Sequence, residues 1–238
     1  MRSNLPRGGY LAWQTYIARG GQILDATIVP VPRNHNTREE NKDIKNGALP
    51  EGWADKPAKR SQKDVDARWT RKHGNSHYGY KNHINADRMH KLVRRYHVSD
   101  AAQHPSHGLQ AKHCRAVDSH AGQHLLRRGN SGCGVWADAA YRSEEMEATL
   151  RTLKLKSHTH RKAKRGTPLT EQAKGSNRTK STVRARVEQV FSAQANDMGG
   201  TLVRMIGMAW AKARIGMKNL ACNRRRLCQL RHLNPCPA

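Results

Sequence analysis

Three acidic residues stand in apolar surroundings in a chain that is otherwise strongly basic. Asp25 lies inside the apolar run 23–31, Asp138 lies inside the apolar run 135–140, and Glu188 lies in an amphipathic segment. A carboxylate in an apolar strand is unfavourable unless a cation satisfies it. In a chain built to hold polyanions, the cation that fits is a divalent metal ion between protein and phosphate. The three acids therefore predict metal-dependent chemistry on nucleic acid.

Such chemistry needs carboxylates that converge on one point. Two divalent ions about 4 Å apart can stabilise the attacking and the leaving oxygen of a phosphoryl transfer. Mg²⁺ takes one or two carboxylates together with water and phosphate oxygens, so three acids suffice. We expect Asp25 to bridge both ions, Asp138 to hold one and Glu188 to hold the other. Arg184, four residues before Glu188 on the same helical face, would contact the scissile phosphate.

Each of these acids also has a plainer interpretation. Asp25 could hydrogen-bond a turn at a strand end, and Asp138 could cap the helix that follows it. Glu188 could form a surface ion pair with Arg184, which contributes roughly a few tenths of a kcal/mol. The sequence alone leaves both interpretations of each residue open.

The overall charge predicts a polyanionic partner. The 238 residues include 44 Lys and Arg against 18 Asp and Glu, which gives a formal net charge of +26. Phosphate contacts supply most non-specific affinity for nucleic acid, so this charge predicts a nucleic-acid partner. The alternative is a basic protein that is merely very soluble. Hydrophobic residues make up only 36%, with a single Phe, which predicts one compact core with long basic segments.

The sequence gives no sign of a membrane or an oxidising compartment. No apolar stretch approaches the roughly 20 residues that span a bilayer, and the first residues lack the apolar core of a secretory signal. The five cysteines form no Cys-x-x-Cys pair, so we expect neither a disulfide framework nor a zinc ribbon, and a reducing cytoplasm fits. The His-rich segment 104–124 could hold zinc or carry solvated histidines, because no pattern fixes the three or four ligands that zinc needs.

The periodicity predicts a mixed α/β fold. We expect a long, basic, partly disordered loop over 33–72 and a basic loop over 161–180. Trp69, inside the first loop, could stack on a base or anchor the loop to the core. Arg224–Arg226 would be a solvated helix face that touches phosphates. Strands are expected at 23–31, 78–86, 90–98, 135–140 and 156–160, and helices at 10–18, 116–126, from Ser143, at 181–194 and at 217–230.

Five ordered motifs resemble those of the bacterial insertion-sequence-five transposases. They are LDATIVP at 24–30, YGYKNH at 78–83, VWADAAYRS at 135–143, KGSNRTK at 174–180 and RARVEQVF at 184–191. The resemblance implies an α/β, RNase H-like mixed sheet flanked by helices, with long basic loops. It also implies an enzyme that cuts DNA at insertion-sequence ends and joins the 3′-hydroxyl to target DNA.

The resemblance carries specific roles onto this chain. The catalytic and metal-binding triad would be Asp25, Asp138 and Glu188, accompanied by Arg184 and by two ions of Mg²⁺ or Mn²⁺. The implied partner is double-stranded DNA, both transposon ends and target, bound by a homo-oligomer in the bacterial cytoplasm at the nucleoid, with no membrane. The family signature places a Tyr three residues before the Arg and a basic residue seven after the Glu. Ser181 and Ala195 occupy those positions here.

The resemblance also predicts a domain organisation. We expect a remnant N-terminal helical segment at 1–20, the catalytic domain at 21–232 with the basic loop 33–72 inside it, and a C-terminal tail at 233–238. Related transposases begin with a long helical DNA-binding region, so we expect an N-terminal truncation. An alternative function follows from this, namely an inactive DNA-binding remnant of a transposase.

Overall fold

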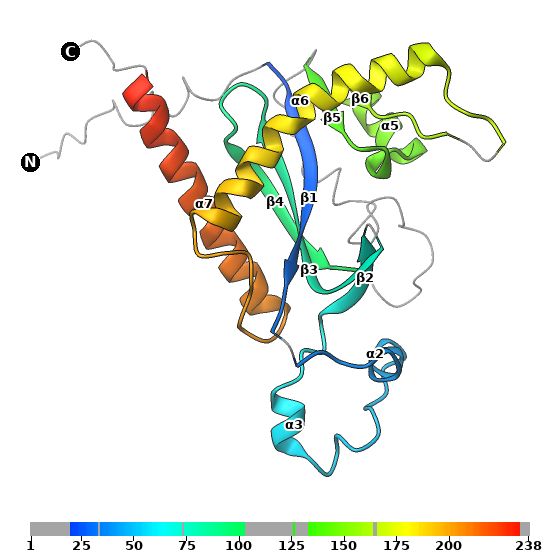
Figure 1. Ribbon diagram of the computed structural model, residues 1–238, viewed down its shortest axis with the longest axis vertical. Helices are drawn as coiled ribbons and strands as arrows, with labels where there is room; N and C mark the ends of the chain where they lie inside the picture. The colour runs from blue at the N-terminus through cyan, green and yellow to red at the C-terminus, as the bar shows by residue number, and fades with distance from the viewer. Residues whose placement is uncertain are drawn as a thin grey trace, which may run out of the picture.

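A mixed sheet forms the centre of the molecule (Figure 1). The structure is a computed structural model that describes residues 20–32, 34–72, 74–102, 126, 133–163 and 166–233. Within these residues six strands pair in the order β2-β3-β1-β5-β6, and β4 also pairs with β3. Their bounds are β1 Gln22–Pro30, β2 Arg68–Lys72, β3 Asn75–Asp87, β4 Val93–Asp100, β5 Gly134–Ala137 and β6 Lys156–Thr159. This is the predicted RNase H-like sheet, because β1 is antiparallel to β3 and parallel to β5.

The central strand β1 is buried on both of its faces. Its β-branched residues favour an extended backbone, and successive side chains point to opposite faces of the sheet. Leu24 belongs to a core cluster with the helix α5 Glu144–Thr152. Ile23 belongs to another cluster with the helices α6 Glu171–Asn196 and α7 Met208–Leu233. Helices therefore cover both faces, and in Figure 1 α6 crosses in front of β1 while α7 runs beside β4.

The predicted strands and the helix after Ser143 are confirmed, with shifted ends. The Ser143 side chain caps α5 by accepting a hydrogen bond from the Met146 backbone N–H at 3.1 Å. The fourth predicted strand ends at Ala137 instead of residue 140, because the following residues form the short 3₁₀ helix η1 Ala139–Tyr141. The predicted helix at 10–18 lies outside the described residues, as does that at 116–126 except for Leu126.

Two helices are much longer than the sequence predicts. The helix α6 begins at Glu171, ten residues before the expected start, so the prediction of a loop up to residue 180 is wrong. Thr170 caps it by accepting a hydrogen bond from the Ala173 backbone N–H at 3.3 Å. The helix α7 begins at Met208, nine residues early. In the first ten residues of α6, exposed basic and polar residues obscured the periodicity, because only Ala173 among them is buried.

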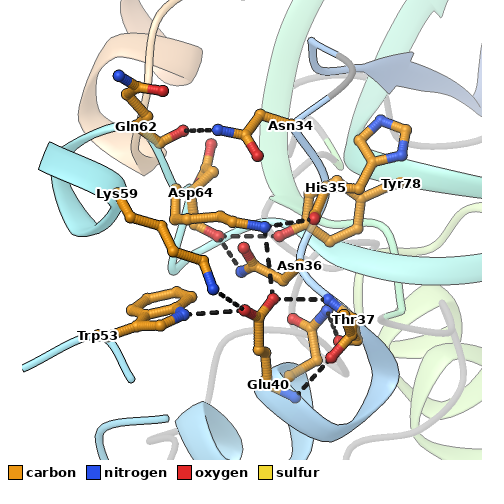
Figure 2. A network of polar contacts seen from close by, with 12 residues as sticks. Asn34, His35, Asn36, Thr37, Glu40, Trp53, Lys59, Gln62, Asp64 and Tyr78 are labelled. Carbon is orange, nitrogen blue, oxygen red and sulfur yellow. Dashed lines mark hydrogen bonds and ion pairs between the residues drawn. The ribbon is translucent and has the colours of Figure 1, made fainter. Parts of the chain in front are cut away.

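The prediction of an irregular loop over 33–72 is also wrong. This segment contains α2 Arg38–Lys45, α3 Pro57–Ser61 and β2. Thr37 and Glu40 form a capping box at the start of α2: the Thr37 hydroxyl accepts from the Glu40 N–H at 3.1 Å, and the Glu40 carboxylate accepts from the Thr37 N–H at 2.8 Å. The indole N–H of the fully buried Trp53 donates to Glu40 at 2.9 Å, as Figure 2 shows. The capping box and the indole contact explain why the segment is ordered.

Charge is also balanced around Glu40. Burial raises the pKa of its carboxyl, but the Thr37 N–H, the Trp53 N–H and the Lys63 ammonium outweigh that effect and lower the pKa to about 2. The Lys63 ammonium lies 3.4 Å from Glu40 and also donates to the His35 carbonyl at 2.7 Å. The carboxylate of Glu40 thus holds Thr37, Trp53 and Lys63 together by accepting from all three.

Asp64 joins this segment to the sheet. Its buried carboxylate accepts hydrogen bonds from the Tyr80 hydroxyl at 2.7 and 2.9 Å and from the Gly207 N–H, just before α7, at 3.2 Å. Its backbone carbonyl accepts from the Tyr78 hydroxyl at 2.8 Å. Trp69 donates to a backbone carbonyl of the same segment at 2.9 Å, so it anchors the segment to the core.

We predict that Asp64→Ala strongly destabilises the protein. The substitution leaves the Tyr80 hydroxyl and buried backbone N–H groups without their acceptor, and each orphaned buried donor costs about 1–3 kcal/mol. We expect the free energy of unfolding in urea at pH 7 to fall by about 3 kcal/mol or more. The exposed Asp55→Ala is the matched control and should change it by less than about 0.5 kcal/mol. Equal effects of the two variants would contradict the role given to Asp64.

Candidate active site

The sheet register places Asp25 beside Asp138. The strands β1 and β5 run parallel, and Leu24 pairs with Ala137, so the next residue of each strand stands at the same level. Asp25 shares the face of Ile23, two residues earlier, and Asp138 shares the face of Trp136. Both carboxylates therefore emerge on the side of the sheet that α6 covers. The structure brings these two predicted site residues together.

Local backbone geometry fixes both carboxylates. Asp25 accepts a hydrogen bond from the Ala26 N–H at 2.8 Å, and Asp138 accepts from the Ala139 N–H at 2.7 Å. Asp138 is also the N-cap of η1, as its plainer interpretation expected. Capping uses only part of the hydrogen-bonding capacity of a carboxylate, so the remaining oxygen lone pairs stay available to a cation.

Arg184 supplies that cation in this structure. Its Nε lies 3.2 Å from Asp25 Oδ2, and its Nη1 lies 3.4 Å from Asp138 Oδ1. The guanidinium thus spans the two carboxylates from the helix α6. The long N-terminal part of α6, which the sequence did not predict, continues the helix beyond this point over β5 and β6 (Figure 1).

Burial and neighbouring charges together shift the pKa of the Asp25 carboxyl. Burial raises the pKa of its carboxyl, the Arg184 charge and the Ala26 N–H lower it, and the neighbouring charge of Asp138 raises it again. The net direction is upward, so Arg184 does not fully offset burial and the second carboxylate. A cation of higher charge density at this point would favour the ionised form more strongly.

His160 is a neighbour of the site that the sequence did not single out. It directly follows β6, and its Nδ1 lies 3.7 Å from Asp138 Oδ1, while its Nε2 lies 3.4 Å from the Ser181 hydroxyl. Burial and the Arg184 charge lower the pKa of the imidazole, so it is neutral at pH 7 and its contact with Asp138 is not an ion pair. His160 directly follows β6, the strand paired with β5, and this position is the sequence signal that could have identified it.

A buried polar contact lies on the opposite face of the sheet, near the aspartates. The Tyr141 hydroxyl is 3.1 Å from His83 Nδ1, and His83 Nε2 is 3.0 Å from the Ser99 hydroxyl. Burial lowers the pKa of His83 to about 3, so its ring is neutral. Burial, followed by the charges of Asp25 and Asp138, raises the pKa of Tyr141, which therefore keeps its proton. Because both groups are uncharged, neither adds a charge beside Asp25 and Asp138.

Glu188 is not part of the contact that Arg184 makes. It lies one helical turn, about 6 Å along the axis, from Arg184, and its side chain is exposed. Its neighbour Val187 is fully buried, and a helix turns about 100° per residue, so Glu188 points away from the core. Within the described residues, Arg184 forms ion pairs with Asp25 and Asp138 but none with Glu188. Its role as third ligand stays a prediction.

The donor set fits one hard divalent cation. Two aspartates on adjacent strands present oxygen ligands, and Mg²⁺ typically uses one or two protein carboxylates. In the part of the chain that the structure describes, no three His, Cys, Asp or Glu side chains are grouped closely enough to hold a metal ion. The predicted zinc alternative at 104–124 lies outside the described residues. None of the described helices has the length and apolarity needed to cross a membrane.

Comparison with known proteins agrees with the motifs. The family model described as the transposase DDE domain matches residues 18–224. A transposase for insertion sequence element IS1106 from Neisseria meningitidis serogroup B is 30% identical over 161 residues, which are 68% of this chain and 51% of the relative. The chain thus spans about half the length of that curated relative. No solved structure matches the chain. The narrower insertion-sequence-five group stays a prediction, but the matched region covers nearly all of the sheet and helices. The chain therefore belongs to the transposase DDE domain family.

Proposed function

We propose that this protein catalyses divalent-metal-dependent cleavage and strand transfer of DNA at insertion-sequence ends. One observation carries the proposal: Asp25 and Asp138 stand at the same level on neighbouring parallel strands, with Arg184 spanning them. Carboxylates that converge beside a cationic side chain are what metal-assisted phosphoryl transfer requires. Membership of the family and the resemblance to an insertion-sequence transposase support the same reaction.

Asp25 and Asp138 would hold Mg²⁺ or Mn²⁺, and Glu188 would complete a site for a second ion. When bound, such ions supply charge stabilisation to the phosphate and acidity to the attacking hydroxyl or water. The backbone N–H groups of Ala26 and Ala139 keep the two aspartates oriented before any substrate arrives. Arg184 offsets part of the negative charge of the two aspartates and would turn its own charge to the scissile phosphate.

The proposed substrate is double-stranded DNA, as transposon end and as target. The net charge of +26 favours a polyanion, and the site opens on a helix that is rich in basic residues. A homo-oligomer on DNA remains part of the proposal, because two transposon ends have to be joined. The inactive DNA-binding remnant is the alternative that the experiments below separate.

Metal binding by the two aspartates is the first test. We expect Mn²⁺ or Mg²⁺ to raise the melting temperature of the wild-type chain, because a ligand that binds only the folded form stabilises it. Asp25→Asn and Asp138→Asn should each abolish the rise, while the exposed Glu145→Gln should keep it. A metal-induced rise that persists in Asp25→Asn would show that the ion binds elsewhere.

The role of Arg184 gives an independent prediction. An ion must displace or share the guanidinium that now contacts both aspartates, so Arg184→Ala should bind Mn²⁺ roughly two- to tenfold more tightly, measured by calorimetry. Cleavage by the same variant should nevertheless fall, because the phosphate loses a cationic contact. Arg186→Ala, on the same helix but directed to the Arg88 carbonyl, is the control and should leave Mn²⁺ affinity unchanged. Weaker Mn²⁺ binding by Arg184→Ala would contradict the competition.

DNA cleavage tests the function itself. With Mn²⁺ and a duplex that carries the ends of its own insertion sequence, we expect nicking that falls at least about 100-fold in Asp138→Asn. Glu188→Gln should fall similarly if α6 brings that carboxylate to the ions. Cleavage by Asp138→Asn at the wild-type rate would refute the assignment. DNA binding without cleavage under any divalent ion would favour the inactive remnant.

A further inference from the structure

A cavity of about 190 Å³ lies between α6, α7 and the turn that joins β3 to β4. Its floor is apolar or uncharged and includes Val190, Ala193, Met198 and Cys222. Burial raises the pKa of the Cys222 thiol, so the floor carries no negative charge there. The rim carries Lys91, Arg225 and Arg226, with Asp197 beside them. An uncharged floor under a cationic rim is a suitable surface for a sugar that carries a phosphate.

Two of the rim cations are held by neutral partners. Arg226 donates from Nε to the His90 carbonyl at 2.9 Å and from Nη1 to the Gln229 side chain at 3.1 Å. Lys91 donates to the side-chain oxygen of Gln189. Among the described residues, no carboxylate forms an ion pair with Lys91 or Arg226. Their charges are therefore oriented and remain unneutralised.

The cations also repel one another. Burial lowers the pKa of Lys91, and the charges of Arg226 and Arg186 lower it further. Only Arg225 has a carboxylate partner in this cavity, the side chain of Asp197. Like charges that are gathered at one cavity favour an anion between them, and a phosphate meets several donors at once.

The position of the cavity relates it to the aspartate pair. The cavity and the aspartate pair both lie along α6. Val190 and Ala193, which line the cavity, are six and nine residues beyond Arg184. At about 1.5 Å per residue, this separation is roughly 9–14 Å along the helix axis. Successive nucleotides of one DNA strand advance about 3.4 Å along the duplex, so the separation matches about three or four nucleotides.

We propose that the cavity formed by Lys91, Arg226 and the α6–α7 junction binds a phosphate group of DNA a few nucleotides from the scissile position. The proposal rests on the proposed function for the identity of the DNA, but phosphate binding itself is independent of catalysis. Its size suits one phosphate with its sugar rather than a drug-sized ligand, because pockets for such ligands have volumes of about 300–1,000 Å³. The phosphate could come from an internal phosphodiester or from a strand terminus.

Charge-removal variants test the cavity in EDTA, so that a missing metal or missing cleavage cannot affect the result. We expect Lys91→Gln and Arg226→Gln each to weaken binding of a DNA duplex roughly tenfold at low salt and to reduce the slope of log K against log salt by about 0.9. Arg224→Gln removes the same charge from an exposed neighbour outside the cavity and is the matched control. Equal losses of affinity and slope in all three variants would overturn the proposal.

A gain of affinity tests the same site without damaging it. Asp197→Asn removes the one carboxylate of the rim and releases Arg225, so it should tighten DNA binding several-fold. Glu51→Gln, an exposed acid in a distant turn, changes the net charge equally and should have a much smaller effect. An equal gain in both variants would show a general field effect and contradict a local site.

Further measurements separate structure from charge and identify the source of the phosphate. Arg226→Lys keeps the charge and should retain most of the affinity for DNA. A loss as large as that of Arg226→Gln would assign Arg226 to packing and overturn its role.

Inorganic phosphate should raise the melting temperature of the wild-type protein more than chloride does at equal ionic strength, and the rise should be smaller in Lys91→Gln. An equal rise in Lys91→Gln would count against the cavity. Loss of affinity by Lys91→Gln for duplexes both with and without a 5′-phosphate indicates an internal phosphodiester, whereas loss only with the 5′-phosphate indicates a terminus.

Discussion

The burial of Asp25 beside Asp138 is the constraint around which the site is built. Two carboxylates at the same level of neighbouring strands repel one another, and Asp25 also loses water, so a cation between them is favourable. Arg184 meets that need, and only a helix that crosses β1 and β5 can deliver it. The position of α6 over the sheet and the pairing of β5 with β1 therefore serve one electrostatic requirement.

The buried Asp64 and the partly buried Asp25 are satisfied in different ways. Asp64 accepts hydrogen bonds from fixed donors, the Tyr80 hydroxyl and backbone N–H groups, and it holds the segment 34–72 against the sheet. Asp25 accepts one backbone hydrogen bond, from Ala26, and is otherwise paired with the end of a long side chain, Arg184. A fixed donor cannot be exchanged without unfolding, whereas a guanidinium can give way to another cation. The fixed donors thus give Asp64 a structural role, whereas the Arg184 contact leaves Asp25 open to exchange with another cation.

The sequence predicted the sheet better than the helices. Strand β1 is rich in apolar and β-branched residues, which mark it plainly. Strand β3 is buried along most of its length although many of its residues are polar. The first ten residues of α6 were missed because they are mostly polar and only Ala173 among them is buried. Segment 34–72 was missed because its order comes from a capping box and from the single indole of Trp53, not from a repeating apolar pattern. Such contacts between individual polar groups leave little periodic signal.

The sequence by itself determined the family and the identity of the acidic candidates, and its charge predicted a polyanionic partner, since these depend on residue types and their order. Only the tertiary structure decided that Asp25 and Asp138 stand at one level, because strand register is a pairing between residues more than 100 positions apart. It also decided that Arg184 reaches both of them while Glu188 faces solvent, because the rotation of α6 is set by the packing of Val187 against the sheet. The cavity at Lys91 and Arg226 likewise exists only where three distant elements meet.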